Sequence, residues 1–339
     1  MEAVPVGVIG CGYWGPNLIR NFNELPSADL VAVADIRPDQ LKRVKSNYTN
    51  VYTTTDYKEL LGDTTQAVVV ATPPTTHHDI VMDCLEHGKH VLVEKPIALT
   101  SAEAREMCEL ARAKDRILMV GHTFAYNPAV HELRRLMESG EIGEVHYIDT
   151  ARLNLGLFQN GLNVLWDLAP HDISILLFLI KDNPISVSAL GTQCVFDGIH
   201  DVVYLTLRFP NNILAHAHVS WLDPCKVRRV TVVGSQKMVV YNDIESQEKI
   251  RIYDKGIDGP ARGDTQWDSA HFSYRYGDII IPNIKSAEPL RQECSHFIDC
   301  INTHTTPCSC GEEGYKVVKI LEAAQKSLSN SGHMEVLEW

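Results

Sequence analysis

The stretch VPVGVIGCGYWGPNL (residues 4–18) decides the fold. A β-branched run, typical of a strand, leads into three glycines spaced G-x-G-x-x-G, and Pro16 then suits the first turn of a helix. In such a strand–turn–helix unit Gly10 permits the tight turn, Gly12 lets a pyrophosphate approach the backbone, and Gly15 lets the helix pack on the strand. Free N–H groups at the helix start are then available to the phosphates. The stretch predicts a dinucleotide-binding unit, against the alternative of a glycine-rich turn in a nucleotide-free α/β fold.

The first 120 residues alternate strand and helix patterns. Strands are predicted at 4–10, 30–35, 67–72, 90–95 and 116–122, and helices at 16–25, 39–48, 76–88 and 101–115. Ser101 is the predicted N-cap of the last helix, and Gly88 closes the one before it. Wholly apolar strands separated by helices indicate a parallel sheet covered on both faces. We therefore predict an α/β fold that begins with a doubly wound Rossmann domain over residues 1–122.

The pattern changes after residue 123. A helix (128–140), a strand (144–154) and a second helix lead into alternating apolar and polar runs from residue 184 to 256. Period-two alternation predicts a large, open-faced, mainly antiparallel sheet, hence an α+β domain over residues 123–339. Residues 257–288 are predicted to be a long loop of the binding kind. A final helix (310–332) is expected to pack back on the first domain.

Composition excludes several classes of protein. The chain has 339 residues, about two domains, and a net charge of −12, which argues against nucleic acid and anionic membranes as partners. The longest strongly apolar run, 173–180, is too short to span a bilayer, and the N-terminus lacks a signal-peptide pattern. Nine scattered cysteines fit free thiols in a reducing compartment, so we expect a cytoplasmic protein. No metal site is predicted, because the cluster at 294–310 lacks paired C-x2-C elements.

Asp35 ends the second strand, about 20–25 residues after the glycines, where a carboxylate accepts both hydroxyls of an adenosine ribose. The same charge repels a 2′-phosphate. The sequence therefore favours NAD, and Arg37, two residues later, keeps NADP as the less favoured alternative.

Two further motifs follow the carboxyl ends of later strands, the edge where open parallel sheets bind ligands. They are ATPPTTH (71–77) and EKP (94–96). Lys95 is predicted to be the last residue of an apolar strand, an unfavourable position for an ammonium group without a function. An ion pair with Glu94 is the structural alternative, although neighbours in a strand point to opposite faces.

In LWDLAPHDISILLFLI (165–180), Asp167 and His171 are four residues apart, directly before a hydrocarbon run. The spacing places both on one helix face. Either they cap and solvate the helix start, with Pro170 in its first turn, or they do chemistry. Asp172 is predicted to be a helix-start carboxylate without a chemical role.

Together these motifs resemble the Gfo/Idh/MocA oxidoreductases. The residues that carry the resemblance are the glycine turn with Asp35, ATPPTTH, EKP, GHTFAYNPAV (121–130) and the D-x-x-x-H of Asp167 and His171. The resemblance covers essentially the whole chain. Two stretches, 166–176 and 219–243, look most like the branch acting on nucleotide-linked sugars, the UDP-N-acetylglucosamine or uronate 3-dehydrogenases.

The resemblance implies two domains, subunit contacts through the open sheet, hence a homodimer or homotetramer, and reversible oxidation of a sugar or polyol hydroxyl. Neutral His171 suits the role of proton acceptor at cellular pH. Lys95 would stabilise the developing alkoxide, and Asp167 would orient a substrate hydroxyl or the imidazole.

The remaining predicted contacts fall into two sets. The expected cofactor contacts are Gly10, Gly12, Tyr13, Trp14, Gly15, Asp35, Ile36, Arg37, Thr72, Pro73, His77, Glu94 and Lys95. The expected substrate contacts are His122, Tyr126, Asn127, Arg152 and Asn154. Outside these sets, His216 and His218 are assigned to a sheet face or interface. Lys226, Arg228 and Arg229 meet a sugar-nucleotide phosphate or form a solvated strand edge.

Several functions stay open at this point. A ketosugar reductase or a polyol dehydrogenase has the same acid–base residues, and sequence does not set the direction of the reaction. An NAD-dependent glycosidase would recycle its cofactor in place. A non-catalytic, cofactor-binding sugar sensor would be expected to lack the lysine or the histidine, and this chain has both.

Overall fold

The computed structural model describes residues 2–156, 158, 162–258 and 272–339. It divides into two compact units: Met1–Asn127 with Ala287–Glu322, and Pro128–Ser286 with Ala323–Trp339. This differs from the single predicted boundary after residue 122, because the chain returns to the first unit late in the sequence. In this returning segment, the carbonyl of Ser309 accepts a hydrogen bond from the amide of Val120, and Cys310 forms a β-bridge with Met119.

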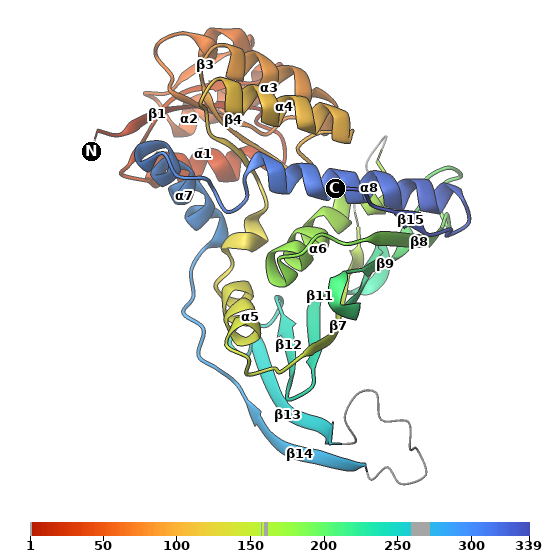
Figure 1. The fold of residues 1–339 in the computed structure, drawn as a ribbon. Helices are drawn as coiled ribbons and strands as arrows, with labels where there is room; N and C mark the ends of the chain where they lie inside the picture. The colour runs from red at the N-terminus through yellow and green to blue at the C-terminus, as the bar shows by residue number, and fades with distance from the viewer. Residues whose placement is uncertain (1, 157, 159–161, 259–271) are drawn as a thin grey trace. The chain divides into compact units, whose positions relative to one another are not determined.

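The first unit is a six-stranded, wholly parallel sheet in the order β3-β2-β1-β4-β5-β6, with helices packed on it (Figure 1). Its central strands are buried along their length because Val, Ile and Ala face helices on both sides. The predicted Rossmann fold is confirmed. The strands are β1 (Val4–Ile9), β2 (Ala28–Ala34), β3 (Tyr52–Thr54), β4 (Ala67–Val70), β5 (His90–Val93) and β6 (Leu118–Val120). The helices are α1 (Gly15–Glu24), α2 (Pro38–Asn47), α3 (His77–Glu86), α4 (Ser101–Ala113), α7 (Pro289–Thr303) and the first part of α8 (Gly311–Ser329).

Two local predictions in this unit are wrong. The N-cap of α4 is Thr100, not Ser101: Thr100 and Glu103 form a reciprocal capping box, and Ser101 is the first helical residue. Strand β5 ends at Val93, so Lys95 lies in the loop beyond the strand.

Helix α7 was not predicted, although its apolar residues recur at helical spacing. Leu290, Cys294, Phe297 and Ile301 are all buried. Phe297 meets Phe22 of α1 edge-to-face, with ring centroids 6.4 Å apart, which holds α7 in the first unit. Polar neighbours such as Glu293 and His296 obscured the pattern.

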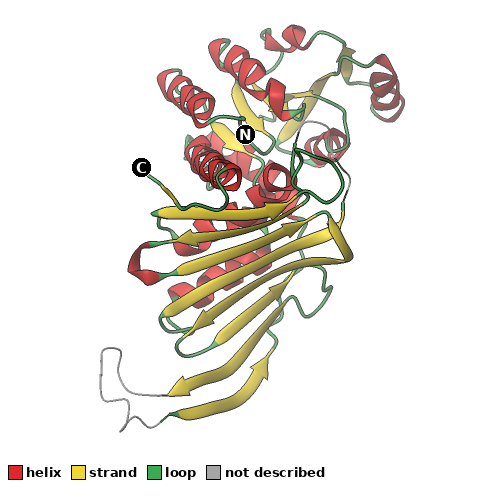
Figure 2. Cartoon of the chain, turned by 90° about the vertical axis from the view of Figure 1, so that its right-hand side faces the viewer, coloured by secondary structure: helices red, strands yellow, loops and turns green. Residues whose placement is uncertain are grey.

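The second unit is built on a nine-stranded sheet in the order β14-β13-β12-β11-β7-β10-β9-β8-β15. Only β7 and β10 pair in parallel, so the predicted mainly antiparallel sheet is confirmed. Helices α5 (Pro128–Glu138) and α6 (Val164–Ile180) pack on one face, and Figure 2 shows the other face of the sheet. The strands are β7 (Val145–Leu155), β8 (Ser186–Thr192), β9 (Val202–Arg208), β10 (Leu214–Ser220), β11 (Leu222–Gly234), β12 (Met238–Asn242), β13 (Ile250–Asp258), β14 (Ser273–Ile280) and β15 (Glu335–Val336).

The long loop predicted over 257–288 is wrong in part. Strand β14 pairs antiparallel with β13, while residues 259–271 lie outside the described residues. Strand β14 is exposed along nearly its whole length, and Arg275 pairs with Asp254 and Asp258 of β13. Its large apolar side chains are all exposed, so pairing with β13, and not a buried face, defines β14 as a strand: they are Tyr274, Tyr276, Ile279 and Ile280. Within the described ranges, no helix combines the length and apolar character needed to cross a membrane.

Candidate functional site

The glycine turn follows β1 and is required by the backbone. Gly10 has φ +99°, and a Cβ there would lie 2.6 Å from the carbonyl oxygen of Ala71. A Cβ at Gly15 would lie 2.1 Å from the carbonyl oxygen of Gly10. Only glycine fits these two positions without moving backbone. Gly12, in contrast, has no heavy atom closer to its would-be Cβ than 3.8 Å, so the chain leaves the backbone approachable there.

Asp35 lies just after β2 and faces this turn. Its Oδ2 accepts a 2.6 Å hydrogen bond from the Cys11 amide, and its Oδ1 accepts from the Arg37 amide at 2.9 Å. Burial raises the pKa of Asp35, but hydrogen bonds from Arg37 and Cys11 outweigh burial and leave that pKa below its ordinary value. The carboxylate is therefore ionised and fits the ribose hydroxyls of NAD. Arg37 is paired with Asp35 (Nε to Oδ1, 3.2 Å), which disfavours a role in binding a 2′-phosphate.

Large apolar side chains surround the turn on its outside. Tyr13 is 88% exposed and Ile36 is 85% exposed, beside the half-exposed Trp14. Exposed aromatic and aliphatic groups next to an approachable backbone and an ionised Asp35 suit the adenosine and pyrophosphate of a dinucleotide. These residues fit NAD. Thr72 and Pro73, in the loop after β4, are exposed to different degrees and stay predicted contacts.

Charged groups gather where β5 and β6 end. Glu94 accepts a hydrogen bond from Trp14, and burial raises the pKa of Glu94 to about 7. His122 is 2% exposed; burial, followed by the charge of Lys95, lowers its pKa to about 4. His122 is therefore neutral at cellular pH. The expected substrate contact of His122 remains a prediction.

Glu293, on α7, joins this group and was not predicted. Its Oε2 accepts a 2.8 Å hydrogen bond from Thr123, which follows β6. Burial, and then the charge of Glu94, raises the pKa of Glu293 well above its ordinary value. Nothing in the local sequence indicated that Glu293 lies beside Thr123 and Glu94, because 170 residues separate Glu293 from Thr123.

Three predicted contacts of the first unit, His77, Tyr126 and Asn127, are buried in the structure. His77 is fully buried, with Nδ1 2.8 Å from the Pro96 carbonyl oxygen and Nε2 2.9 Å from that of Thr72. Its ring links the loops after β4 and β5 instead of facing a ligand. Tyr126 is also buried, and its hydroxyl lies 3.0 Å from Oγ of Ser309. Asn127, next to it, is buried as well.

In the second unit, helix α6 begins earlier than predicted. Asn163 is the N-cap, since its side chain accepts from the Trp166 amide, so Asp167 is not the cap. Pro170 lies inside the helix, not in its first turn. A proline often marks the first turn of a helix, whereas α6 accommodates Pro170 in its second turn. Asp167 and His171 stand on one face of the helix, and both are partly exposed.

Asp167 is held by Trp221, a residue given no role from sequence. The indole Nε1 of Trp221 donates a 3.0 Å hydrogen bond to Oδ2 of Asp167. Trp221 is 1% exposed, and a Cβ at Gly156 would lie 2.3 Å from its Cδ1, so backbone packs directly on the ring. The carboxylate of Asp167 is thus held by a donor that is itself packed in the interior.

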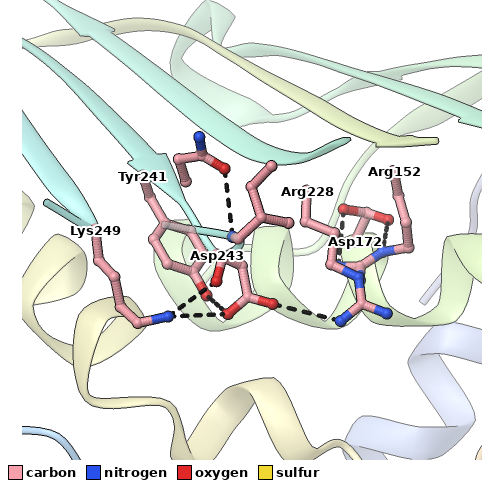
Figure 3. Close-up of polar contacts among 8 residues, drawn as sticks. Arg152, Asp172, Arg228, Tyr241, Asp243 and Lys249 are labelled. Atoms are coloured by element: carbon pink, nitrogen blue, oxygen red, sulfur yellow. Dashed lines mark hydrogen bonds and ion pairs between the residues drawn. The ribbon is translucent and has the colours of Figure 1, made fainter. Parts of the chain in front are cut away.

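Arg152 and Asp172 form a buried ion pair between β7 and α6 (Figure 3). Nε of Arg152 lies 2.7 Å from Oδ2 of Asp172, and the two side chains are 6% and 2% exposed. Two predictions are corrected: Arg152 is engaged inside the unit instead of facing a substrate, and Asp172 anchors the middle of α6 instead of its start. Asn154, two residues after Arg152 on β7, shares its sheet face and is partly exposed.

The histidines of β10 make sheet-face contacts. Nδ1 of His216 lies 3.1 Å from Oδ1 of Asp149. The ring of His218 stacks on that of Tyr204, with centroids 4.1 Å apart. Lys226 and Arg229 are exposed, and Arg228 lies near Asp243. Across the residues that the structure describes, no group of three or more His, Cys, Asp or Glu side chains could hold a metal ion.

Comparison with known proteins agrees with this geometry. Residues 4–122 match the model of an oxidoreductase family with an NAD-binding Rossmann fold, and residues 130–240 match the GFO/IDH/MocA C-terminal domain. The myo-inositol 2-dehydrogenase of Thermotoga maritima is 25% identical over 349 residues, which cover 98% of each chain.

Solved structures share the fold over nearly the whole chain. UDP-N-acetylglucosamine 3-dehydrogenase from Acidithiobacillus ferrooxidans has a TM-score of 0.82 at 20% identity, covering 98% of this chain and 99% of that one. Levoglucosan dehydrogenase, solved with NADH and levoglucosan, has a TM-score of 0.83 at 20% identity, covering 99% of each chain. At this identity the likeness is one of fold.

Proposed function

Because the chain belongs to the Gfo/Idh/MocA family of NAD-dependent oxidoreductases, we propose that it reversibly oxidises a secondary hydroxyl of a nucleotide-linked amino sugar or uronate. NAD-dependent oxidation of a sugar or polyol hydroxyl, with reduction of the corresponding ketone by NADH as the reverse reaction, is the activity of the family. The observation that carries the proposal is the pair of Asp167 and His171 on one partly exposed face of a helix whose other side chains are mostly buried.

Each residue has a separate task in this reaction. His171 takes the hydroxyl proton, for which a neutral imidazole is suited. Lys95 donates a hydrogen bond to the reacting oxygen and stabilises its negative charge as the C=O bond forms. Asp167, fixed by Trp221, orients the substrate hydroxyl or the imidazole. When bound, NAD supplies the acceptor for the hydride that leaves the carbinol carbon.

The nucleotide-linked substrate is supported by the sequence resemblance of 166–176 and 219–243 to that branch. A UDP-N-acetylglucosamine 3-dehydrogenase also shares the fold, and a myo-inositol 2-dehydrogenase is similar in sequence. Polyols therefore belong in the same test.

Absorbance of NADH at 340 nm, measured with UDP-, dTDP- and GDP-sugars beside myo-inositol and other free polyols, tests the proposal. We expect net NADH formation with a nucleotide sugar. Net NADH also excludes a glycosidase that recycles its cofactor. His171→Ala and Lys95→Ala should each abolish turnover. NAD binding, measured by titration calorimetry, should be retained in both variants. Full activity in either variant would contradict the catalytic role proposed for the substituted residue.

We also propose a homodimer or homotetramer formed through the sheet face opposite α6. That face exposes Tyr147, Leu190, Tyr204 and Leu214, which are neighbours across strands. Light scattering on the purified protein, compared with Tyr204→Glu, tests this assembly. The nine free cysteines support a reducing compartment such as the cytoplasm.

A further inference from the structure

Two arginines lie directly opposite each other in the sheet of the second unit. Arg228 of β11 is the register partner of Arg152 of β7. Directly opposed like charges destabilise an antiparallel pair. Figure 3 shows both side chains on the α6 side of the sheet, the side that carries Asp172. Something must offset their repulsion.

Two carboxylates, Asp172 and Asp243, lie next to the two arginines. Asp172 is occupied by Arg152, whose Nε and Nη2 donate to its two oxygens at 2.7 and 3.3 Å. Asp243 accepts a 2.9 Å hydrogen bond from the Tyr241 hydroxyl, lies 3.7 Å from Nζ of Lys249, and is 3.5 Å from Nη1 of Arg228. Within the described residues, these ion pairs join three cationic side chains, Arg152, Arg228 and Lys249, to the two carboxylates.

Of the two arginines, Arg228 has the weaker contact with a carboxylate. Its single contact with Asp243, at 3.5 Å, is at the limit of a hydrogen bond. Its Nε and Nη2 donate to no residue within the described part of the chain, and its side chain is 39% exposed. In contrast, the side chain of Arg152 is 6% exposed and donates two hydrogen bonds to Asp172. Arg228 is therefore a guanidinium with free donors that a ligand can reach.

We propose that Arg228 binds an anionic group of the sugar substrate, a carboxylate or a phosphate. A guanidinium offers two parallel N–H donors that match two oxygens of either group. Asp172 immediately follows His171, the proposed proton acceptor. Burial raises the pKa of Asp172, and the nearby charges of Arg152 and then Arg228 act against that rise. The inference rests on the proposed function and assigns a residue that recognises the anionic group of its substrate.

Binding, measured without turnover, tests the inference. The NAD-loaded full-length protein is titrated calorimetrically with D-glucuronate, α-D-glucose 1-phosphate and UDP-N-acetylglucosamine, and with myo-inositol as the neutral probe. Arg228→Met is compared with Arg229→Met, which removes the same charge from the next residue of β11, on the other face of the sheet. Arg228→Lys keeps the charge but loses the planar fork.

We expect Arg228→Met to weaken binding of an anionic probe about tenfold or more. Arg229→Met should change binding less than about twofold, and Arg228→Lys should lie between the two. Loss confined to glucuronate identifies a carboxylate subsite, whereas loss confined to the phosphate-containing probes identifies a phosphate subsite. Melting temperatures of the variants show that each is folded.

The inference is overturned if both methionine variants weaken binding equally, if myo-inositol binding falls as much as anion binding, or if no anionic probe binds the wild type more tightly than myo-inositol. The proposed function fails separately. If Arg228→Met selectively loses anion binding but no sugar yields NADH, the anion site is supported and the dehydrogenase function is not. If turnover does not depend on Arg228, the dehydrogenase function is supported and the anion site is not.

Discussion

The buried indole of Trp221 donates a 3.0 Å hydrogen bond to Oδ2 of Asp167, a residue 54 positions earlier in the chain. Trp221→Phe removes this donor and retains most of the ring volume. We expect kcat/KM to fall about tenfold, the effect of losing a hydrogen bond to a charged group, with NAD affinity unchanged. Steady-state kinetics and NAD titration measure both. Trp166→Phe on α6 is the control, and an equal loss of kcat/KM in that variant would separate Trp221 from the reaction.

Arg152→Met leaves Asp172 as an uncompensated buried charge. We expect a loss of about 3–5 kcal/mol in the free energy of unfolding. The double variant Arg152→Met, Asp172→Leu removes both charges and should recover most of that loss, because an apolar pair avoids the desolvation cost of the ions. Chemical denaturation of the three proteins gives the values. A double variant as unstable as the single one would show that packing, not charge, dominates.

The pKa of Glu94 makes stability pH-dependent. Folded Glu94 holds its proton up to about pH 7, whereas an ordinary glutamate loses it near 4.5. Between these values the folded protein binds more protons than the unfolded chain, so stability falls as pH rises, by at most about 1.4 kcal/mol per pH unit. Glu94→Gln removes this term. Its melting temperature should therefore decline less than that of the wild type between pH 5 and 7.

The exposed Glu109 supplies the control for that experiment. Glu109→Gln should reproduce the wild-type slope of melting temperature against pH. Parallel slopes in wild type and Glu94→Gln would contradict the raised pKa.

Asp35 should set cofactor preference. Asp35→Asn removes the charge that receives the ribose hydroxyls and disfavours a 2′-phosphate. We expect NAD affinity to fall about tenfold, and the ratio of NADP to NAD affinity to rise. Fluorescence titration with each cofactor measures the ratio, and Asp39→Asn, at an exposed carboxylate on α2, is the charge control. An unchanged ratio in Asp35→Asn would assign the preference elsewhere.

The fold was largely predictable because its signals are local. Apolar runs such as 67–70 mark buried parallel strands, and glycines mark the turn after β1. The errors arise where a local rule met tertiary context. Thr100 rather than Ser101 caps α4, Pro170 lies inside α6, and β14 forms by pairing with β13 although none of its faces is buried.

The candidate site divides in the same way. The sequence by itself determined the doubly wound sheet, the dinucleotide turn with Asp35, and the motifs containing Lys95, Asp167 and His171, because each is a short pattern whose chemistry is carried by its own residues. Only the tertiary structure decided the partners: Trp221 for Asp167, Asp172 for Arg152, and Thr123 for Glu293. Hydrophobic periodicity states which face of an element is buried. Which polar groups then meet depends on strand register and helix packing, which are set by the whole unit at once.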